Sequence, residues 1–221
     1  NRWQSALSYR FSYNDVNLYN KGDRVSNYTY YQHMASATFQ RIWRNIRCVL
    51  GVEFDQFHYN DILVMPSYAS FAASPEDEYF FSYSYNMFFE NFNRRSYPTR
   101  GMKWTAGINL YTSDFWHYHS RPAIPIANYS WEMAISTGSR FTVLPSVYGR
   151  FVWKTDVPYA LHNGIGGLVG GRYKEQQMPF VGVGYMELVN PMTAVASLKL
   201  RQRMGSNHYA TLTSHFALSS I

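Results

Sequence analysis

The sequence predicts an all-β fold, an antiparallel transmembrane β-barrel, from three observations. Apolar or aromatic residues alternate with polar ones along most of the 221 residues, and a period of two is that of a β-strand with one apolar and one polar face. Aromatic residues make up 19% of the chain and charged residues 15%, below the roughly 25% charged residues usual in soluble domains. No apolar run reaches the about 18 residues that indicate a membrane-spanning helix, so a membrane crossing would use strands.

The first segment shows the alternation most clearly. Trp3, Leu7 and Phe11 occupy odd positions between residues 3 and 13, while the even positions are polar or small. The pattern recurs about ten times, mostly in segments as long as the about 9–11 residues that a tilted strand needs to cross a bilayer. We expect strands at residues 2–14, 28–42, 46–58, 79–92, 102–112, 128–138, 141–153, 180–188, 192–203 and 208–219.

The connections between these segments alternate in length. Short ones are expected at 43–45, 138–140 and 189–191, a moderate one at 93–101, and long ones at 15–27, 60–78, 113–127 and 154–179. Outer-membrane barrels have short periplasmic turns and longer loops outside, so the strand at 2–14 is expected to run outward from the periplasm. The short connection at 205–207 then falls on the long-loop side, as an exception to this rule.

The charged faces of the strands are expected to point into a lumen, because a charge facing lipid costs about 2–4 kcal/mol at the bilayer midplane. The candidate lumenal charges, whose carboxylates we expect to pair with the cations, are Arg10, Glu53, Asp55, Glu132, Arg150, Lys199 and Arg201. Aromatic residues crowd the strand ends, which is typical of the girdles at bilayer interfaces. The competing interpretation, a soluble β-sandwich, would place more Lys and Glu on its outer face.

Two motifs stand out between the strands. The first is a turn before the strand at 102–112, in which Tyr97, Pro98 and Gly101 carry the turn signal. The second is a glycine-rich loop that leads into Gln-Gln-Met-Pro-Phe-Val-Gly. The candidate residues of this loop are Gly166, Gly167, Gly170, Gly171, Arg172, Pro179, Phe180 and Gly182. A phosphate-binding loop would need a following helix, and no helical period follows.

Both motifs resemble those of a known family. The Pro-x-x-Gly turn after an aromatic residue resembles the turn-strand signature of the BamA/TamA-type outer-membrane barrel superfamily. The glycine-rich loop with Arg172-Tyr173, followed by Gln-x-Pro-Phe-x-Gly, resembles the C-terminal outer-membrane barrel of patatin-like phospholipases over roughly residues 80–219. The resemblance implies a barrel of about 16 strands, within the usual range, in the outer membrane of a Gram-negative bacterium. It also implies a loop that folds back into the lumen, with Arg172 pointing inward.

The same resemblance sets expectations about function. The Val-Arg-Gly-Phe signature of the assembly proteins is absent, which argues against an insertase and favours the patatin-linked branch. Patatin-like enzymes place their nucleophile in Gly-x-Ser-x-Gly, and this chain contains no such motif. We therefore expect an anchoring or translocating barrel whose catalytic domain lies outside the chain. Residues 1–221 would form a single barrel domain that lacks strands at both ends and an N-terminal domain.

The expected partners follow from this interpretation. They are outer-membrane lipid, the barrel-assembly machinery during insertion and, as a candidate, a second copy in a homodimer. No Lys/Arg-rich run points to nucleic acid. No catalytic residue, cofactor or metal is expected within the chain.

Other interpretations stay open. One is a receptor, porin or transporter barrel for a small ligand, with the long loops as its binding surface. Another is an enzyme acting on lipid at the barrel rim through His208, Ser214 and His215, although no acid pairs with them by sequence. His117 and His119, two residues apart, could share one face and bind a metal, and the acidic run at 76–78 could bind calcium.

Overall fold

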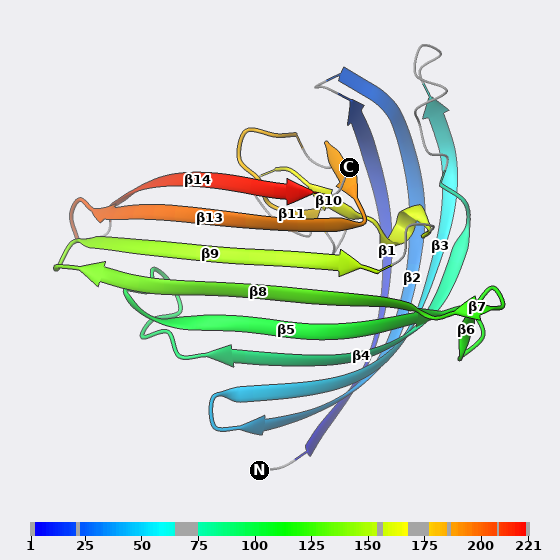
Figure 1. Ribbon diagram of the computed structural model, residues 1–221, viewed down its shortest axis with the longest axis horizontal. Helices are drawn as coiled ribbons and strands as arrows, with labels where there is room; N and C mark the ends of the chain where they lie inside the picture. The colour runs from blue at the N-terminus through cyan, green and yellow to red at the C-terminus, as the bar shows by residue number, and fades with distance from the viewer. Residues whose placement is uncertain are drawn as a thin grey trace.

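One strongly curled antiparallel sheet dominates the computed structural model (Figure 1). The structure describes residues 3–20, 23–64, 75–153, 157–167, 177–184, 187–206 and 208–219. Nine strands pair in the order β1-β2-β3-β4-β5-β8-β9-β13-β14. They are β1 (Trp3–Asn20), β2 (Asp23–Trp43), β3 (Ile46–Val64), β4 (Glu78–Glu90), β5 (Arg100–Thr112), β8 (Ile124–Thr137), β9 (Phe141–Val152), β13 (Met192–Arg203) and β14 (Tyr209–Ser219).

Smaller elements lie in two connections of the sheet. β6 (His117–Tyr118) and β7 (Arg121–Pro122) form a hairpin between β5 and β8. The connection from β9 to β13 holds a three-stranded sheet of β11 (Gln177–Met178), β10 (Asn163–Ile165) and β12 (Leu188–Asn190), after a short 3-10 helix, η2 (Tyr159–Leu161). Within the described ranges, no helix has the length and apolar character needed to cross a bilayer.

The expected all-β antiparallel fold is confirmed, and nine of the expected strands belong to the main sheet. The expected strand at 180–188 is wrong. Phe180 makes only an isolated bridge to Gly167, and a turn follows it. Gly182 has φ +92°, in the left-handed region that only glycine adopts easily, and this breaks the extended run that the apolar residues suggested.

Losing that strand changes which end of the sheet each later connection occupies. β13 pairs antiparallel with β9, with Gln202 opposite Phe141, so β13 ends beside the tight turn at 138–140. The connection near 205–207 therefore lies with the short turns at the left of Figure 1, and not on the long-loop side as expected. This connection is therefore no exception to the rule of short turns at one end and long loops at the other. Two other connections depart from the rule, because only two residues separate β1 from β2 at the loop end and nine separate β4 from β5 at the short-turn end.

Strands extend further toward the loop end than the polarity of the sequence suggested. The expected loop at 15–27 is wrong, because β1 and β2 stay paired from Asp15 opposite Thr29 up to Asn20 opposite Asp23. β3 likewise continues to Val64. Ladder hydrogen bonds join backbone groups and tolerate polar side chains.

The two faces of the sheet have the expected polarity. Large apolar side chains such as Leu7, Ile108 and Leu198 lie exposed on the outer face, whereas Asp55, Arg150 and Arg201 are buried on the inner face. The sequence did not indicate that the inner face also carries the main apolar core, toward the loop end. This core comprises Val16, Val25, Tyr28, Tyr30, Phe57, Phe80, Tyr111, Tyr118, Ile124, Ile126, Val152, Ala160 and Leu161.

The orientation of the faces gives a direct prediction. Ile108 points outward from β5 and is 54% exposed, while its neighbour Asn109 points inward and lines cavities. Ile108→Arg is expected to lower the free energy of unfolding by about 2–4 kcal/mol in lipid vesicles, because it places a charge in hydrocarbon. Asn109→Arg is the matched control and should cost far less in the same urea titration. Equal losses for the two variants would contradict this assignment of the faces.

Candidate functional site

The connection between β9 and β13 folds back against the inner face of the sheet. We call its described residues, 157–167, 177–184 and 187–191, the lumenal segment. The ring of Tyr159 meets Tyr28 of β2 edge-on at 5.6 Å, and Phe180 lies 5.4 Å from the ring of His215 of β14. Tyr148 of β9 donates its hydroxyl to the carbonyl of Pro179. The segment therefore bridges strands near both ends of the sheet, within its curl (Figure 1).

A buried pair, Arg150 and Asn163, holds this segment to β9. Arg150 Nη1 donates to the carbonyl of Leu161 at 2.7 Å and to Asn163 Oδ1 at 2.6 Å. Asn163 Nδ2 donates to the carbonyls of Arg150 and Pro191, both at 2.9 Å. The side chain of Asn163 thus ties the start and the end of the lumenal segment to one strand. Arg150 was expected in the lumen, but nothing in the sequence marked Asn163 as its partner.

The glycines of the lumenal loop allow a tight backbone crossing. Gly166 and Gly167 have φ +133° and +80°, values that residues with a side chain rarely adopt. Gln177 Nε2 donates to the Gly166 carbonyl at 2.8 Å, and the amide of Phe180 donates to the Gly167 carbonyl at 2.9 Å. This holds the two described parts of the loop together. Gly170, Gly171 and Arg172 lie outside the described residues, so the inward arginine stays a prediction.

The candidate charges lie on the inner faces of their strands, and three of them, Glu132, Arg150 and Arg201, have contacts that the sequence did not predict. Glu132 forms an ion pair with Lys103 at 3.5 Å, and Lys103 was not among the candidates. Arg150 and Arg201 donate to carbonyls, and within the described ranges neither forms an ion pair with a carboxylate. The remaining candidates are Asp55, which accepts from Gln32 at 2.9 Å, Arg10 beside the Met34 sulfur, Glu53 on β3, and Lys199 near His215.

The Tyr-Pro-Thr-Arg-Gly motif forms the turn that was expected, and it also reaches across the short-turn end. We call residues 91–99 the rim turn. Tyr97 stacks on Tyr209 of β14, with ring centroids 4.3 Å apart. Arg201 lies over the same two rings and donates to the Pro98 carbonyl. The sequence could not indicate this contact, because Pro98 and Arg201 are 103 residues apart.

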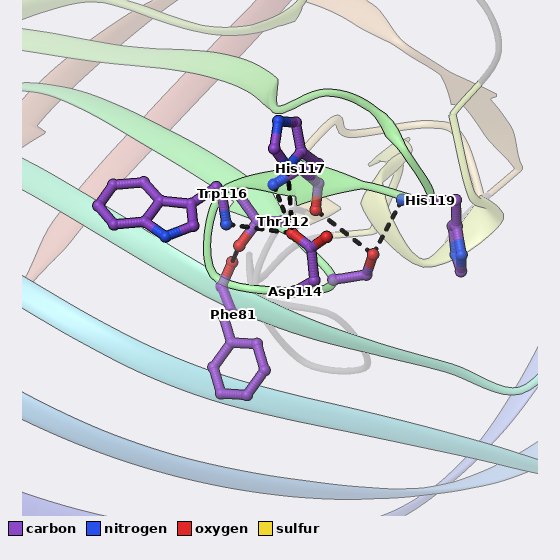
Figure 2. Close-up of polar contacts among 7 residues, drawn as sticks. Phe81, Thr112, Asp114, Trp116, His117 and His119 are labelled. Carbon is purple, nitrogen blue, oxygen red and sulfur yellow. Dashed lines mark hydrogen bonds and ion pairs between the residues drawn. The ribbon is translucent and has the colours of Figure 1, made fainter.

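The β6–β7 hairpin does not bring its two histidines together (Figure 2). His117 Nδ1 lies 3.7 Å from Asp114, whereas His119 Nε2 lies 3.5 Å from Glu78. His119 and Ser120 have φ +46° and +65°, so the backbone turns between the two imidazoles. No group of three or more His, Cys, Asp or Glu in the described part of the chain could hold a metal ion.

The candidate catalytic residues at the rim are also separated. Ser214 and His215 are consecutive on β14 and therefore point to opposite faces. His215 faces the lumenal segment through Phe180, whereas Ser214, opposite Leu198, lies on the outer face. The geometry does not assemble a serine nucleophile with a histidine base at this position.

The Asp114 carboxylate organises the loop before the hairpin and should make it sensitive to acid. It accepts from the amides of His117 at 2.6 Å and Trp116 at 3.2 Å. These bonds, above all the one from His117, hold the pKa of Asp114 below its ordinary value. A carboxyl with a lowered folded pKa stabilises the loop fully above its unfolded pKa, and this is lost as the pH falls through the folded pKa.

We therefore expect the hydrogen-exchange protection of the Trp116 and His117 amides, corrected for intrinsic rates, to fall at acid pH. Asp114→Ala is the control, with low protection at every pH. Protection of the native loop that stays equally high from neutral pH down to a pH at which the Asp114 carboxyl is protonated in the folded protein would contradict this role.

Comparisons with known proteins agree with this architecture. The model of the OMP85 superfamily matches residues 2–219. BamA from Haemophilus ducreyi, in a crystal structure lacking POTRA domains 1–3, superposes with a TM-score of 0.66 at 15% sequence identity. The match covers 97% of this chain and 46% of that chain. The sequence matches none of the curated proteins with which it was compared. The chain spans about half of the BamA chain, and at this identity the likeness concerns the fold.

The family match extends over almost the whole chain, and the long antiparallel strands, the outward apolar face and the inward charges agree with it. The chain is a member of the Omp85 superfamily, with the fold of an outer-membrane β-barrel.

Proposed function

We propose that this chain is the barrel domain of a patatin-like phospholipase in the outer membrane of a Gram-negative bacterium. It anchors or translocates a catalytic domain that lies outside the chain. The lumenal segment supports the proposal. Its residues Gly166-Gly167 and Pro179-Phe180 belong to the sequence motif that resembles the patatin-linked barrels. Both pairs lie in the segment that folds back against the inner face of an Omp85-family sheet. The lack of Gly-x-Ser-x-Gly in the 221 residues agrees with a catalytic centre elsewhere.

We also propose that the nine strands are part of a barrel of about 16, a size common among such proteins. Unpaired strand edges in lipid cost several kcal/mol for each backbone group, and no ladder joins β14 to β1 among the described residues. Further strands would close the barrel. Outer-membrane lipid and the barrel-assembly machinery are the partners that fit this role, and the homodimer stays a prediction.

The test begins with the native protein. Intact mass and peptide mapping of the outer-membrane form would show whether sequence precedes Asn1. An upstream domain with Gly-x-Ser-x-Gly, and phospholipid hydrolysis that disappears when its serine becomes alanine, would support the proposal. A native protein that begins near Asn1, without hydrolysis, would overturn it. A pore or a small-ligand receptor would then be the better interpretation, to be examined by single-channel conductance.

A further inference from the structure

A cavity lined by four arginines lies at the short-turn end of the sheet, apart from the lumenal segment. It has a volume of about 290 Å³, and we call it the arginine cavity. Its lining comes from the rim turn, the β8–β9 turn and the ends of β13 and β14. The lining residues are Arg94, Thr99, Ser136, Gly138, Ser139, Arg140, Thr142, Arg201, Arg203 and Tyr209. No acidic residue lines this cavity.

Two of the four guanidinium groups are held in place by the fold. Arg201 is only 8% exposed, lies over Tyr97 and Tyr209, and donates to the Pro98 carbonyl. Arg203 donates through Nε to the Gly205 carbonyl at 2.8 Å and through Nη2 to the Ser206 carbonyl at 3.1 Å. Groups already fixed in position lose little freedom when a ligand binds.

The other two guanidinium groups are free to close on a ligand. Arg94 and Arg140 are exposed, and within the described ranges neither makes an ion pair. Glu132, an acid that acts on Arg201 electrostatically, is already paired with Lys103 at 3.5 Å. Four like charges around one small space repel each other, and this repulsion is relieved when an anion enters.

The donor chemistry indicates which anion. Arginine presents a planar fork of N–H donors that matches the oxygens of phosphate in bidentate geometry. The hydroxyls of Ser139 and Thr142 add further donors to the same lining. The volume is near the lower end of ligand pockets, which begin at about 300 Å³, and so suits a headgroup-sized molecule.

We propose that the arginine cavity binds a phosphate ester. Arg201 and Arg203 are the donors held in place by the fold, and Arg94 and Arg140 are exposed side chains that move to contact the bound ester. The ester is either a soluble phosphate or the headgroup of a phospholipid, since both present the same oxygens. This site does not depend on the identity of any upstream domain. It depends only on the residues of this chain that line the cavity.

The test is calorimetric titration of the folded protein in a nonionic, phosphate-free detergent at about 0.15 M salt, where long-range charge effects are screened. The probes are inorganic phosphate, glycerol 3-phosphate and a short-chain phosphatidylglycerol. Tighter binding of the phosphatidylglycerol than of glycerol 3-phosphate would identify a lipid headgroup as the ligand. Equal binding of the two would identify a soluble ester.

A matched pair of double variants decides whether the cavity is the site. Arg94→Gln with Arg140→Gln is expected to weaken binding at least about tenfold. The reason is that each variant removes charge-assisted hydrogen bonds to the phosphate, which contribute more to affinity than neutral ones. Arg44→Gln with Arg95→Gln removes the same charge from exposed arginines at the same end that do not line the cavity, and should leave the affinity within about twofold.

Equal weakening in the two double variants would overturn the proposal, because binding would then follow net charge alone. The absence of saturable binding of all three probes up to about 10 mM would overturn it as well. A saturable site for poly-glutamate but for none of the phosphates would replace it with a docking site for an acidic protein segment.

Discussion

Arg150→Met is expected to lower the free energy of unfolding by about 2–5 kcal/mol and to release the lumenal segment from β9. The variant leaves the Leu161 carbonyl and Asn163 Oδ1 without the donor that they share at 2.7 and 2.6 Å. Each buried acceptor left without a donor costs about 1–3 kcal/mol. Urea unfolding in lipid vesicles measures the loss. Hydrogen exchange at the Leu161, Gly166 and Phe180 amides, which are hydrogen-bonded within the segment, should also become at least about tenfold faster, as more than about 1.4 kcal/mol of local stability is lost.

Two controls distinguish the loss of the Arg150–Asn163 hydrogen-bond network from a general effect of losing an arginine. Arg95→Met removes an exposed arginine of the rim turn and should be within about 0.5 kcal/mol of the native protein. Asn163→Leu should resemble Arg150→Met, and the double variant should be less destabilised than the sum of the two, because both act on one network. Additive losses with unchanged hydrogen exchange of the segment would show that Arg150 and Asn163 do not act together.

Gly101→Ala is expected to destabilise the junction between the rim turn and the start of β5 by about 3 kcal/mol or more. Gly101 has φ +109°, and an added Cβ would lie 2.5 Å from the Asn91 carbonyl oxygen. The left-handed conformation alone costs about 1–2 kcal/mol for a residue with a side chain, and the overlap with backbone adds about 1–3 kcal/mol. Asn91 pairs with Met102 through backbone and side chain, so the start of β5 would shift.

Gly138→Ala is the matched control for the overlap. Gly138 also has a positive φ, +85°, but an added Cβ there meets nothing within 4 Å. Its cost should be limited to the about 1–2 kcal/mol of the backbone conformation. The difference between the two urea midpoints isolates the clash at Asn91. Equal destabilisation would mean that the backbone conformation, and not the close approach, makes glycine necessary at residue 101.

The strand pattern was readable from the sequence because alternation is a local property. Successive side chains of a strand point to opposite faces, so the odd positions of β1 and the even positions of β3 could be assigned to the outer face without knowing any partner strand. Where a local signal was ambiguous, the predictions were wrong. Among the described residues of the apolar run at 180–188, none pairs with a strand of the main sheet, and Leu188 belongs to β12 of the small sheet. The polar residues of 15–27 concealed a continuing ladder.

The candidate sites depended on contacts that no local pattern contains. The sequence placed Arg150 and Arg201 on an inner face but gave them carboxylate partners, whereas the fold supplies Leu161 and Asn163 to one and Pro98 to the other. The glycine-rich loop and the Tyr-Pro turn were recognised as connections. Their positions against β9 and β14 follow from the curl of the whole sheet.

By itself, the sequence determined the all-β class, the membrane-facing alternation and nine of the long strands, because these depend on side chains within about ten residues of each other. Only the tertiary structure decided that the lumenal segment bridges β2 and β14, and that the rim turn, the β8–β9 turn and β13 surround one cavity of four arginines. The physical reason is that curling a nine-stranded sheet brings together residues as far apart as Pro98 and Arg201. Such contacts arise from the summed twist of all the strands and not from any one segment.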